Sequence, residues 1–158
     1  MKMILFLALF FVCTNAQSQD TAKMKQIDSI VNVINASNLK VQKDSILKDY
    51  SELGFTMKTY VTMVLDGKEL KKYSDSTNAV NHENGIEKQT NSSSTFYYDQ
   101  NKLIKVEESI EEETRKGKVQ WYFSDGKPLF STLPSEKEQE RAELLLTISK
   151  SVLKQVIK

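Results

Sequence analysis

The chain has 158 residues, a formal net charge of +1 and one cysteine, and 39% of its residues are hydrophobic. This length suits one domain with a sizeable core and is too short for two. The near-neutral charge excludes a strong electrostatic field that would attract nucleic acid or an anionic membrane, so we expect neither partner.

The first 16 residues are typical of a secretory signal peptide. Lys2 provides a positive start, an apolar run extends to Val12, and Ala16 offers a small residue at the cleavage point. The apolar run is shorter than the roughly 20 residues that a membrane-spanning helix needs. The sequence therefore predicts a signal peptide over 1–16 and a single globular domain over 17–158. We expect this domain to be exported to the periplasm or the medium, with no transmembrane segment after cleavage.

Cys13 lies where a lipoprotein signal places its lipid-accepting cysteine, so a lipid anchor is the alternative. Phe11 and Val12 are bulky where that signal normally has small residues, which favours plain cleavage after Ala16. Cleavage removes the only cysteine, so the domain has no disulfide and must be held together by its core.

Two helices are predicted at the start of the domain. From about Asp20 to Ala36, apolar residues recur at steps of three and four, with Asp20 or Thr21 as a plausible N-cap. A second helical pattern ends at Gly54, a common stop residue. The first apolar stripe contains Met24, Ile27, Val31 and Ile34, and the second contains Ile46, Leu47, Tyr50 and Leu53.

From residue 56 the apolar period changes to two, which predicts strands. One strand covers 56–65, and a tight turn at Asp66-Gly67 leads to a return strand over 69–73. The polar stretch 74–94 predicts a long loop, or a poorly paired strand around 86–90.

Residues 96–104 align without a gap on residues 121–129, which predicts two hairpins built on one plan. Each has an aromatic triplet, a turn and then an apolar pair. The turns are assigned to Asn101-Lys102 and Gly126-Lys127. Another hairpin between the two copies completes an antiparallel meander of about six strands.

A capping box of Ser135 and Glu138 opens a C-terminal helix with an apolar stripe. This helix needs an apolar surface to cover, and the sheet provides one. The predicted fold class is α+β: an antiparallel meander of about six strands, packed on one face by the N-terminal helices and the long C-terminal helix. The stripe contains Leu145, Ile148, Val152 and Val156.

The aromatic residues of the sheet give the main functional prediction. Neighbours on a strand point to opposite faces, so Tyr97 and Tyr122 are expected to face outward together. An exposed tyrosine platform can hold a peptide or a sugar ring. We therefore predict a non-enzymatic binding module with Tyr97 and Tyr122 as ligand-binding residues and an envelope protein, peptide or glycan as partner. The expected core aromatics are Phe96, Tyr98, Trp121 and Phe123.

The alternative is a small glycan-active or other hydrolase that uses glutamates near Glu108. Alternation places Glu108 and Glu112 on one face, and paired carboxylates can cleave a glycosidic bond or bind calcium. The surrounding lysines favour a solvated, charge-paired edge instead. His82, the only histidine, is expected to be a solvated loop residue, and the sequence predicts no metal site and no cofactor. Enzymatic activity is therefore the less favoured class. A third option is a structural or inhibitor protein of the envelope that pairs through a sheet edge.

Four Asp-Ser/Thr-apolar triplets resemble the acceptor that Bacteroidota use for O-glycosylation of exported proteins. The predicted acceptors are Thr21, Ser29, Ser45 and Ser76. Asp followed by Ser or Thr is also common at helix starts and turns, so a purely structural role is the alternative.

The start ending in Asn15-Ala16-Gln17 and the tandem hairpins resemble small secreted proteins of Bacteroidota whose function is unknown. The hairpins are also similar to those of repeat antitoxins and membrane-occupation repeats. This likeness covers only about 96–130, and Asn101 replaces the glycine in the first copy. The resemblance implies no function and no site residues.

Overall fold

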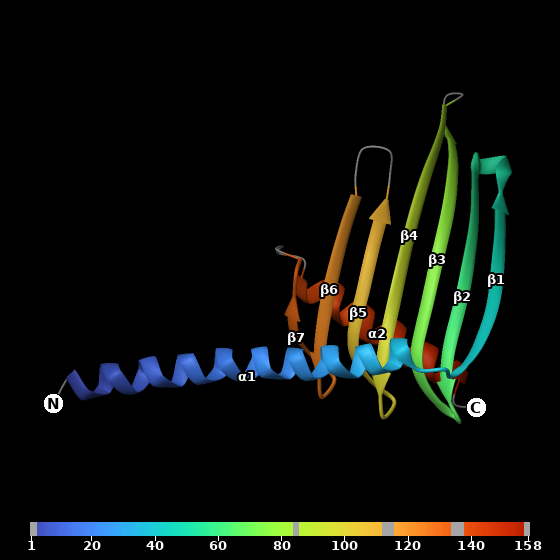
Figure 1. The fold of residues 1–158 in the computed structure, drawn as a ribbon. Helices are drawn as coiled ribbons and strands as arrows, with labels where there is room; N and C mark the ends of the chain where they lie inside the picture. Colours follow the sequence, from blue (N-terminus) through green and yellow to red (C-terminus); the bar gives the residue numbers. More distant parts are fainter. Residues whose placement is uncertain (1–2, 84–85, 112–115, 134–137, 157–158) are drawn as a thin grey trace.

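The computed structural model describes residues 3–83, 86–111, 116–133 and 138–156, and shows one antiparallel sheet flanked by two helices (Figure 1). The sheet has seven strands in sequence order, so each strand pairs with the next. The predicted α+β meander is confirmed, with seven strands instead of six. The elements are α1 (Met3–Ala36), β1 (Lys40–Tyr50), the 3-10 turn η1 (Ser51–Leu53), β2 (Phe55–Asp66), β3 (Glu69–Glu83), β4 (Ile86–Asp99), β5 (Lys102–Glu111), β6 (Lys116–Ser124), β7 (Lys127–Ser131) and α2 (Glu138–Val156).

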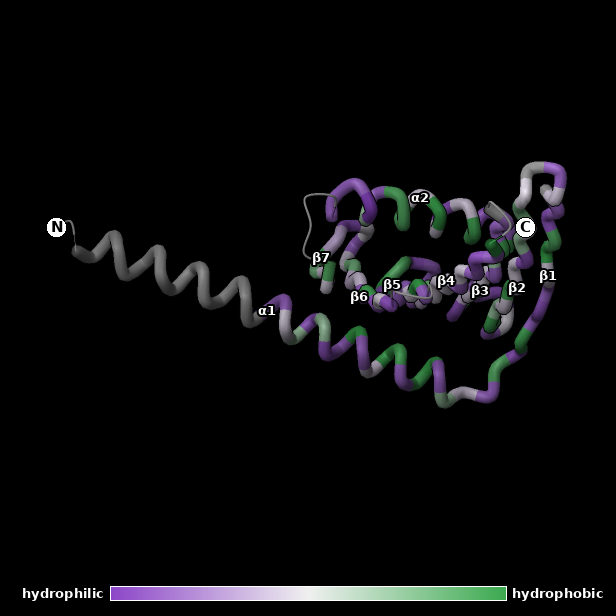
Figure 2. The backbone as a smooth tube through the Cα atoms, turned by 90° about the horizontal axis from the view of Figure 1, so that it is seen from above, coloured by the Kyte–Doolittle hydropathy of each residue, from purple (hydrophilic) through white to green (hydrophobic). Residues whose placement is uncertain are grey.

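The two helices cover opposite faces of the sheet, which we name the α1 face and the α2 face (Figure 2). The expectation that all helices cover one face is wrong. Because aromatic residues are neighbours on β4 and on β6, the strands present large apolar side chains on both faces, and each face needs a cover. The predicted core aromatics Phe96, Tyr98, Trp121 and Phe123 are all buried on the α2 face, together with Leu145 and Val152 of α2.

Helix α1 contacts the sheet through the predicted stripe. Ile27, Val31 and Ile34 are buried against the α1 face, and Met24 packs beside them. The helix runs without a break from Met3, so neither Asp20 nor Thr21 is an N-cap. The predicted stripe of α2 is also confirmed, while the predicted cap residue Ser135 lies outside the described residues.

The second predicted helix is wrong, because residues 40–50 form strand β1. This strand pairs with β2 along its whole length, from Lys40 opposite Leu65 to Tyr50 opposite Phe55. A full ladder of backbone hydrogen bonds outweighs a weak local helical pattern. Gly54 does act as a stop residue, but it ends η1, with a φ of 70°.

The predicted long loop over 74–94 is also wrong, because most of it belongs to β3 and β4. The two strands pair from Lys72 opposite Tyr97 to Glu83 opposite Ile86. Polar side chains bond across this pair, as in the 2.8 Å contact from Asn78 Nδ2 to Asn91 Oδ1. This part of the sheet extends beyond both helices (Figure 1), so it lacks the apolar alternation that marks a half-buried strand.

Three hairpins share one pattern of strand pairing, which confirms the predicted repeat. Their central turn residues are Gly67-Lys68, one position later than predicted, and Gln100-Asn101 and Asp125-Gly126, each one position earlier than predicted. In each hairpin the register shifts at the equivalent point, and one extra residue on the outgoing strand forms a bulge. The shifts lie at Val64/Leu65, Tyr97/Tyr98 and Tyr122/Phe123.

We predict that Gly54→Ala destabilises the protein by about 1–3 kcal/mol. The positive φ of Gly54 disfavours any side chain, and a Cβ there would lie 2.9 Å from the carbonyl oxygen of His82. Urea unfolding followed by circular dichroism measures the loss. Gly117→Ala is the matched control, because its Cβ would lie 3.7 Å from Ile110 Cγ2, an ordinary contact. Equal losses in both variants would contradict this account.

Candidate functional site

Tyr97 and Tyr122, the predicted ligand-binding residues, do lie on the same face of the sheet, but α1 covers them. Their exposed fractions are 3% and 6%, and both pack against Ile27, Val31 and Ile34. The prediction that they form an outward platform is therefore wrong. The helix is needed here because the sheet would otherwise expose two large rings to water.

Lys105 shows how α1 is held on this face. It is only 5% exposed, and its Nζ lies 2.9 Å from Asp28 Oδ1 and 3.0 Å from Glu107 Oε1. Tyr122 Oη donates to Asp28 Oδ1 at 3.0 Å. Burial opposes the charged ammonium, but the bonds to Asp28, Glu107 and Tyr122 outweigh it and raise the pKa of Lys105. This network anchors α1 and leaves the Tyr122 hydroxyl occupied.

Tyr97 is enclosed in a similar way. Asn35 Nδ2 donates to its hydroxyl at 3.4 Å, and Lys72 Nζ lies 5.3 Å from the centre of its ring. Burial raises the pKa of both the Tyr97 and the Tyr122 phenols. Both tyrosines are thus structural residues in this fold.

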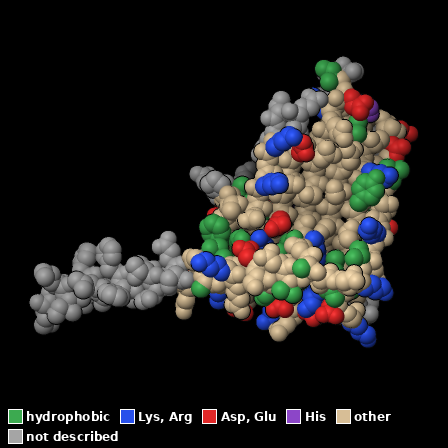
Figure 3. Space-filling view, in the orientation of Figure 1, with side chains coloured by type: hydrophobic (Ala, Val, Ile, Leu, Met, Phe, Trp, Pro, Cys, Tyr) green, Lys and Arg blue, Asp and Glu red, His purple; other side chains and the backbone are tan. Residues whose placement is uncertain are grey.

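Beyond α1, few hydrophobic or charged side chains show on the same face of the sheet (Figure 3). Neighbouring strands bond there through short polar side chains, such as Ser93 Oγ and Ser109 Oγ at 2.8 Å. Tyr60 is an aromatic residue of this face that is 50% exposed, and Lys58 Nζ lies 5.0 Å from its ring centre. The exposed part of the α1 face is therefore a polar surface and not the predicted tyrosine platform.

The opposite face contains a groove of about 690 Å³ between the sheet and α2. Phe96, Ser94 and Ser92 are alternate residues of β4 and lie on the α2 face. The groove opens where the large Phe96 side chain is followed by the two small serine side chains. Small side chains leave space beneath a helix that larger ones hold away from the sheet. The groove is lined mainly by Ser92, Ser94, Glu108, Ile110, Val119, Trp121, Leu133, Glu140, Arg141 and Leu144.

Glu108 is the central charged residue of this groove, and its side chain is 15% exposed. Its Oε2 accepts hydrogen bonds from Trp121 Nε1 at 2.9 Å and from Arg141 Nε at 3.3 Å, and its Oε1 pairs with Arg141 Nη2. The expectation that the glutamate run is a solvated edge is wrong for Glu108. It does describe Glu111, which is paired with Lys116 across the β5–β6 hairpin.

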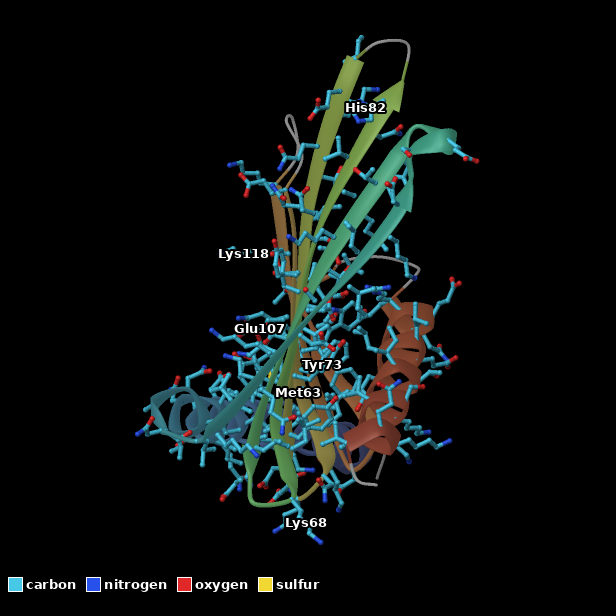
Figure 4. The ribbon with its side chains drawn as sticks, turned by 90° about the vertical axis from the view of Figure 1, so that its right-hand side faces the viewer. Met63, Lys68, Tyr73, His82, Glu107 and Lys118 are labelled. Carbon is cyan, nitrogen blue, oxygen red and sulfur yellow. The ribbon has the colours of Figure 1, made fainter. Side chains whose placement is uncertain are left out.

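The predicted alternation of the glutamates is confirmed for the described ones. Glu107 points to the α1 face, where it contacts Lys105, and Glu108 points to the α2 face. Figure 4 shows Glu107 on the side of the sheet opposite to Tyr73, which faces α2. Glu112 and Glu113 lie outside the described residues.

Asp75 lies near the groove, two strands from Glu108. The pairing of Asp75 with Ser94, and of Ser94 with Glu108, places the three side chains in one row on the α2 face. Burial and the negative charge of Glu108 raise the pKa of the Asp75 carboxyl, against a backbone hydrogen bond from Ser94 that lowers it. Two carboxyl groups therefore face the same side of the sheet in different environments.

The four predicted O-glycosylation residues all have exposed side chains. Thr21 and Ser29 lie on α1, Ser45 on β1 and Ser76 on β3. Glycosylation stays a prediction. His82 is exposed as predicted, but it belongs to strand β3 and not to a loop (Figure 4).

No known protein family, curated protein or solved structure matches the chain. Within the described residues, no helix is long and apolar enough to span a membrane. The same part of the chain has no cluster of three or more His, Cys, Asp or Glu side chains that could hold a metal ion.

The sequence reasoning missed the groove because its residues come from distant segments. One signal was present: Arg141 stands one helical turn before Leu145, so it shares the sheet-facing side of α2 with a fully buried residue. A charged residue at that position needs a partner on the sheet. The serines 92–94 gave a second signal, since three small residues follow one another shortly before the large aromatic residues 96–98.

We predict that Lys105→Met destabilises the protein by about 3 kcal/mol, the lower end of the cost of breaking a buried ion pair, because Asp28 and Glu107 lose their cation but are partly exposed. Limited proteolysis of α1, together with chemical unfolding, measures the effect. Lys118→Met is the matched control, because Lys118 is an exposed lysine on the same face of the neighbouring strand. If the two variants lose the same stability, Lys105 does not anchor α1.

We also predict that Asp75→Asn raises the melting temperature at pH 7. A carboxyl whose pKa is raised by folding favours the folded state only while it is protonated. That contribution is complete below the unfolded pKa of about 3.9 and is lost as the pH rises through the folded value. Thermal melts from pH 3 to pH 7 should show the two proteins converging at low pH. An advantage of Asp75→Asn that is constant across this range would contradict the prediction.

Proposed function

We propose that this protein is an exported, non-enzymatic binding module whose ligand occupies the groove between α2 and the sheet. The observation that carries the proposal is the groove itself, about 690 Å³ in volume with a charged pair at its floor. Ligand sites of proteins are typically concave, mostly apolar, and contain a few well-placed polar groups. The buried tyrosines Tyr97 and Tyr122 have no direct part in this function.

The chemistry of the groove favours an amphipathic ligand. Ile110, Val119 and Leu144 offer apolar walls, and Leu144 is 46% exposed at the rim. Arg141 has five N–H donors, and its two described bonds to Glu108 leave others for a ligand carbonyl or carboxylate. An apolar side chain of a peptide, or a sugar ring with its hydroxyls toward the serines, meets these requirements.

Export is part of the same proposal. The contacts that hold α1 on the sheet include Lys23 Nζ to Ser124 Oγ at 2.9 Å and the packing of Met24, Ile27, Val31 and Ile34. All of them lie after the predicted cleavage point at Ala16. A chain that begins at Gln17 therefore keeps the part of α1 that these contacts use.

The second candidate is a small hydrolase, and the Asp75–Glu108 pair favours it. Two strand spacings place their backbones about 10 Å apart. Inverting glycosidases need carboxyl groups about 6.5–9.5 Å apart, one of them with a raised pKa. The bonds of Glu108 to both Arg141 and Trp121 favour the binding role, because a general base must be free to reach a water molecule.

Native mass spectrometry of the protein purified gently from its own cells and medium tests the proposal. We expect a chain that begins at Gln17 and carries a bound peptide or glycan. Ser94→Leu should lose the bound molecule, because the larger side chain fills the floor of the groove. Ser76→Leu, an exposed change on the opposite face, should retain it.

Two other outcomes would contradict the proposal. A bare protein in every preparation would remove the binding role, and a lipid on Cys13 would replace the free exported form by an anchored one. Hydrolysis of a glycan or peptide that is lost in both Asp75→Asn and Glu108→Gln would establish the enzymatic alternative.

A further inference from the structure

Strand β1 is an open edge of the sheet (Figure 1). It is 11 residues long, and its described side chains, Lys40 to Asp49, are all exposed. The other edge strand, β7, has 5 residues and includes Pro128. A long edge with unpaired backbone groups is a template for another strand, and proteins normally shorten or disrupt it.

Exposed apolar side chains gather at the same edge. Ile46 and Leu47 are 49% and 68% exposed, and Tyr60 on the adjacent strand is 50% exposed. Leu47 and Tyr60 face the α1 side, because Ser45 pairs with Tyr60 and Leu47 with Lys58. Ile46 faces the α2 side. Both faces of the edge thus offer apolar surface to a partner.

The charges of β1 have no partners across the sheet. Lys43 and Asp44 stand opposite Thr62 and Val61, and Lys48 and Asp49 stand opposite Met57 and Thr56. In the described part of the chain, neither Lys43 nor Lys48 forms an ion pair. Asp44 and Asp49 each accept one hydrogen bond from a nearby backbone N–H, at 2.7 and 2.9 Å, through a single carboxylate oxygen.

We propose that β1 pairs antiparallel with β1 of a second copy of this chain, about a two-fold axis at Ile46. This register sets Lys43 opposite Asp49 and Asp44 opposite Lys48, and symmetry forms each pair twice. The Lys43–Asp49 pairs lie on the α1 side and the Asp44–Lys48 pairs on the α2 side. The two sheets become one continuous sheet, and like faces stay on the same side.

The registers centred on the neighbouring residues 44, 45, 47 and 48 lack this match. Outward-facing backbone groups alternate along an edge strand, so a symmetric pair must place one residue on the axis. An axis at Ser45 or Leu47 brings no opposite charges together, and an axis at Asp44 or Lys48 sets like charges against each other. If the charges of β1 served only to prevent strand pairing, no register between two copies of β1 would be attractive. Here one register is attractive on both faces.

The same register covers the apolar edge. Ile46 meets its own copy at the axis, and Ser45 stands opposite Leu47 of the other copy. Tyr60 and that Leu47 therefore flank the small Ser45 side chain in one row. A contact limited to one strand pair belongs to the small interfaces, below about 1,200 Å², so the dimer depends on protein concentration. It also weakens in 1 M salt, where the Debye length is about 3 Å.

A charge-swap experiment with the purified chain tests the pairing. Analytical ultracentrifugation should show a concentration-dependent dimer for the natural sequence and monomers for Asp44→Lys/Asp49→Lys and for Lys43→Asp/Lys48→Asp. An equal mixture of the two variants should recover the dimer, because all four cross-strand pairs become opposite in charge. Circular dichroism of each variant checks that it is folded. A natural chain that stays monomeric at several hundred micromolar, or a mixture that does not recover the dimer, would overturn the proposal.

A disulfide experiment tests the register. In a chain without Cys13, Ile46→Cys should form a dimer under mild oxidation, because the two cysteines meet at the axis. Ser45→Cys is the control, since the proposed register sets its two copies farther apart than the limit of about 7 Å between Cα atoms. Efficient cross-linking of Ser45→Cys and not of Ile46→Cys would refute the proposed register.

Discussion

Strand β5 forms an ion pair with each helix, from opposite faces of the sheet. Lys105 binds Asp28 of α1, and Glu108 binds Arg141 of α2. Both residues of β5 are largely buried, so each charge depends on its helix for a partner. The apolar packing of the two layers gives most of the stabilisation, and these two bonds set the position of each helix along the sheet. The groove exists because α2 is fixed at Glu108, above the point where the large side chains of β4 give way to serines.

Local patterns in the sequence predicted the elements that carry their own signal. The stripes of α1 and α2 follow a helical period against an apolar surface, and the core aromatics alternate along β4 and β6. The repeated hairpins were also visible, because their turns need residues that accept a positive φ, such as Asn101 and Gly126. The bulges could not be predicted, since an extra residue on one strand changes the strand pairing without changing the amino-acid composition of the hairpin.

The errors have one physical origin: properties that depend on a neighbouring strand or layer. Strand β1 has a helical pattern, but β2 provides it with a complete ladder of hydrogen bonds. Strands β3 and β4 are polar, and they are ordered by each other through contacts such as Asn78 to Asn91. The exposure of Tyr97 and Tyr122 depended on where α1 lies. Alternation placed both tyrosines on one face correctly, but it contains no information about what covers that face.

Arg141 and Asp75 belong to the candidate site for reasons that only the assembled fold reveals. Arg141 has an unusual place on the buried side of α2, and this marks it as a residue in need of a partner. In the sequence, Asp75 is notable only as the first residue of an Asp-Ser-Thr triplet. Its raised pKa arises from burial and from a glutamate that is 33 positions away along the chain.

The anchoring of α1 also has a consequence for the order of folding. The residues that bind Asp28 follow it by 77 and 94 positions, so the ribosome completes α1 long before its docking surface exists. Helix α1 cannot close over the sheet until β5 and β6 have been synthesised and paired, and its apolar stripe stays uncovered through most of translation. Docking of α1 is therefore a late step of folding, and a nascent chain in this state presents an accessible N-terminal segment to chaperones.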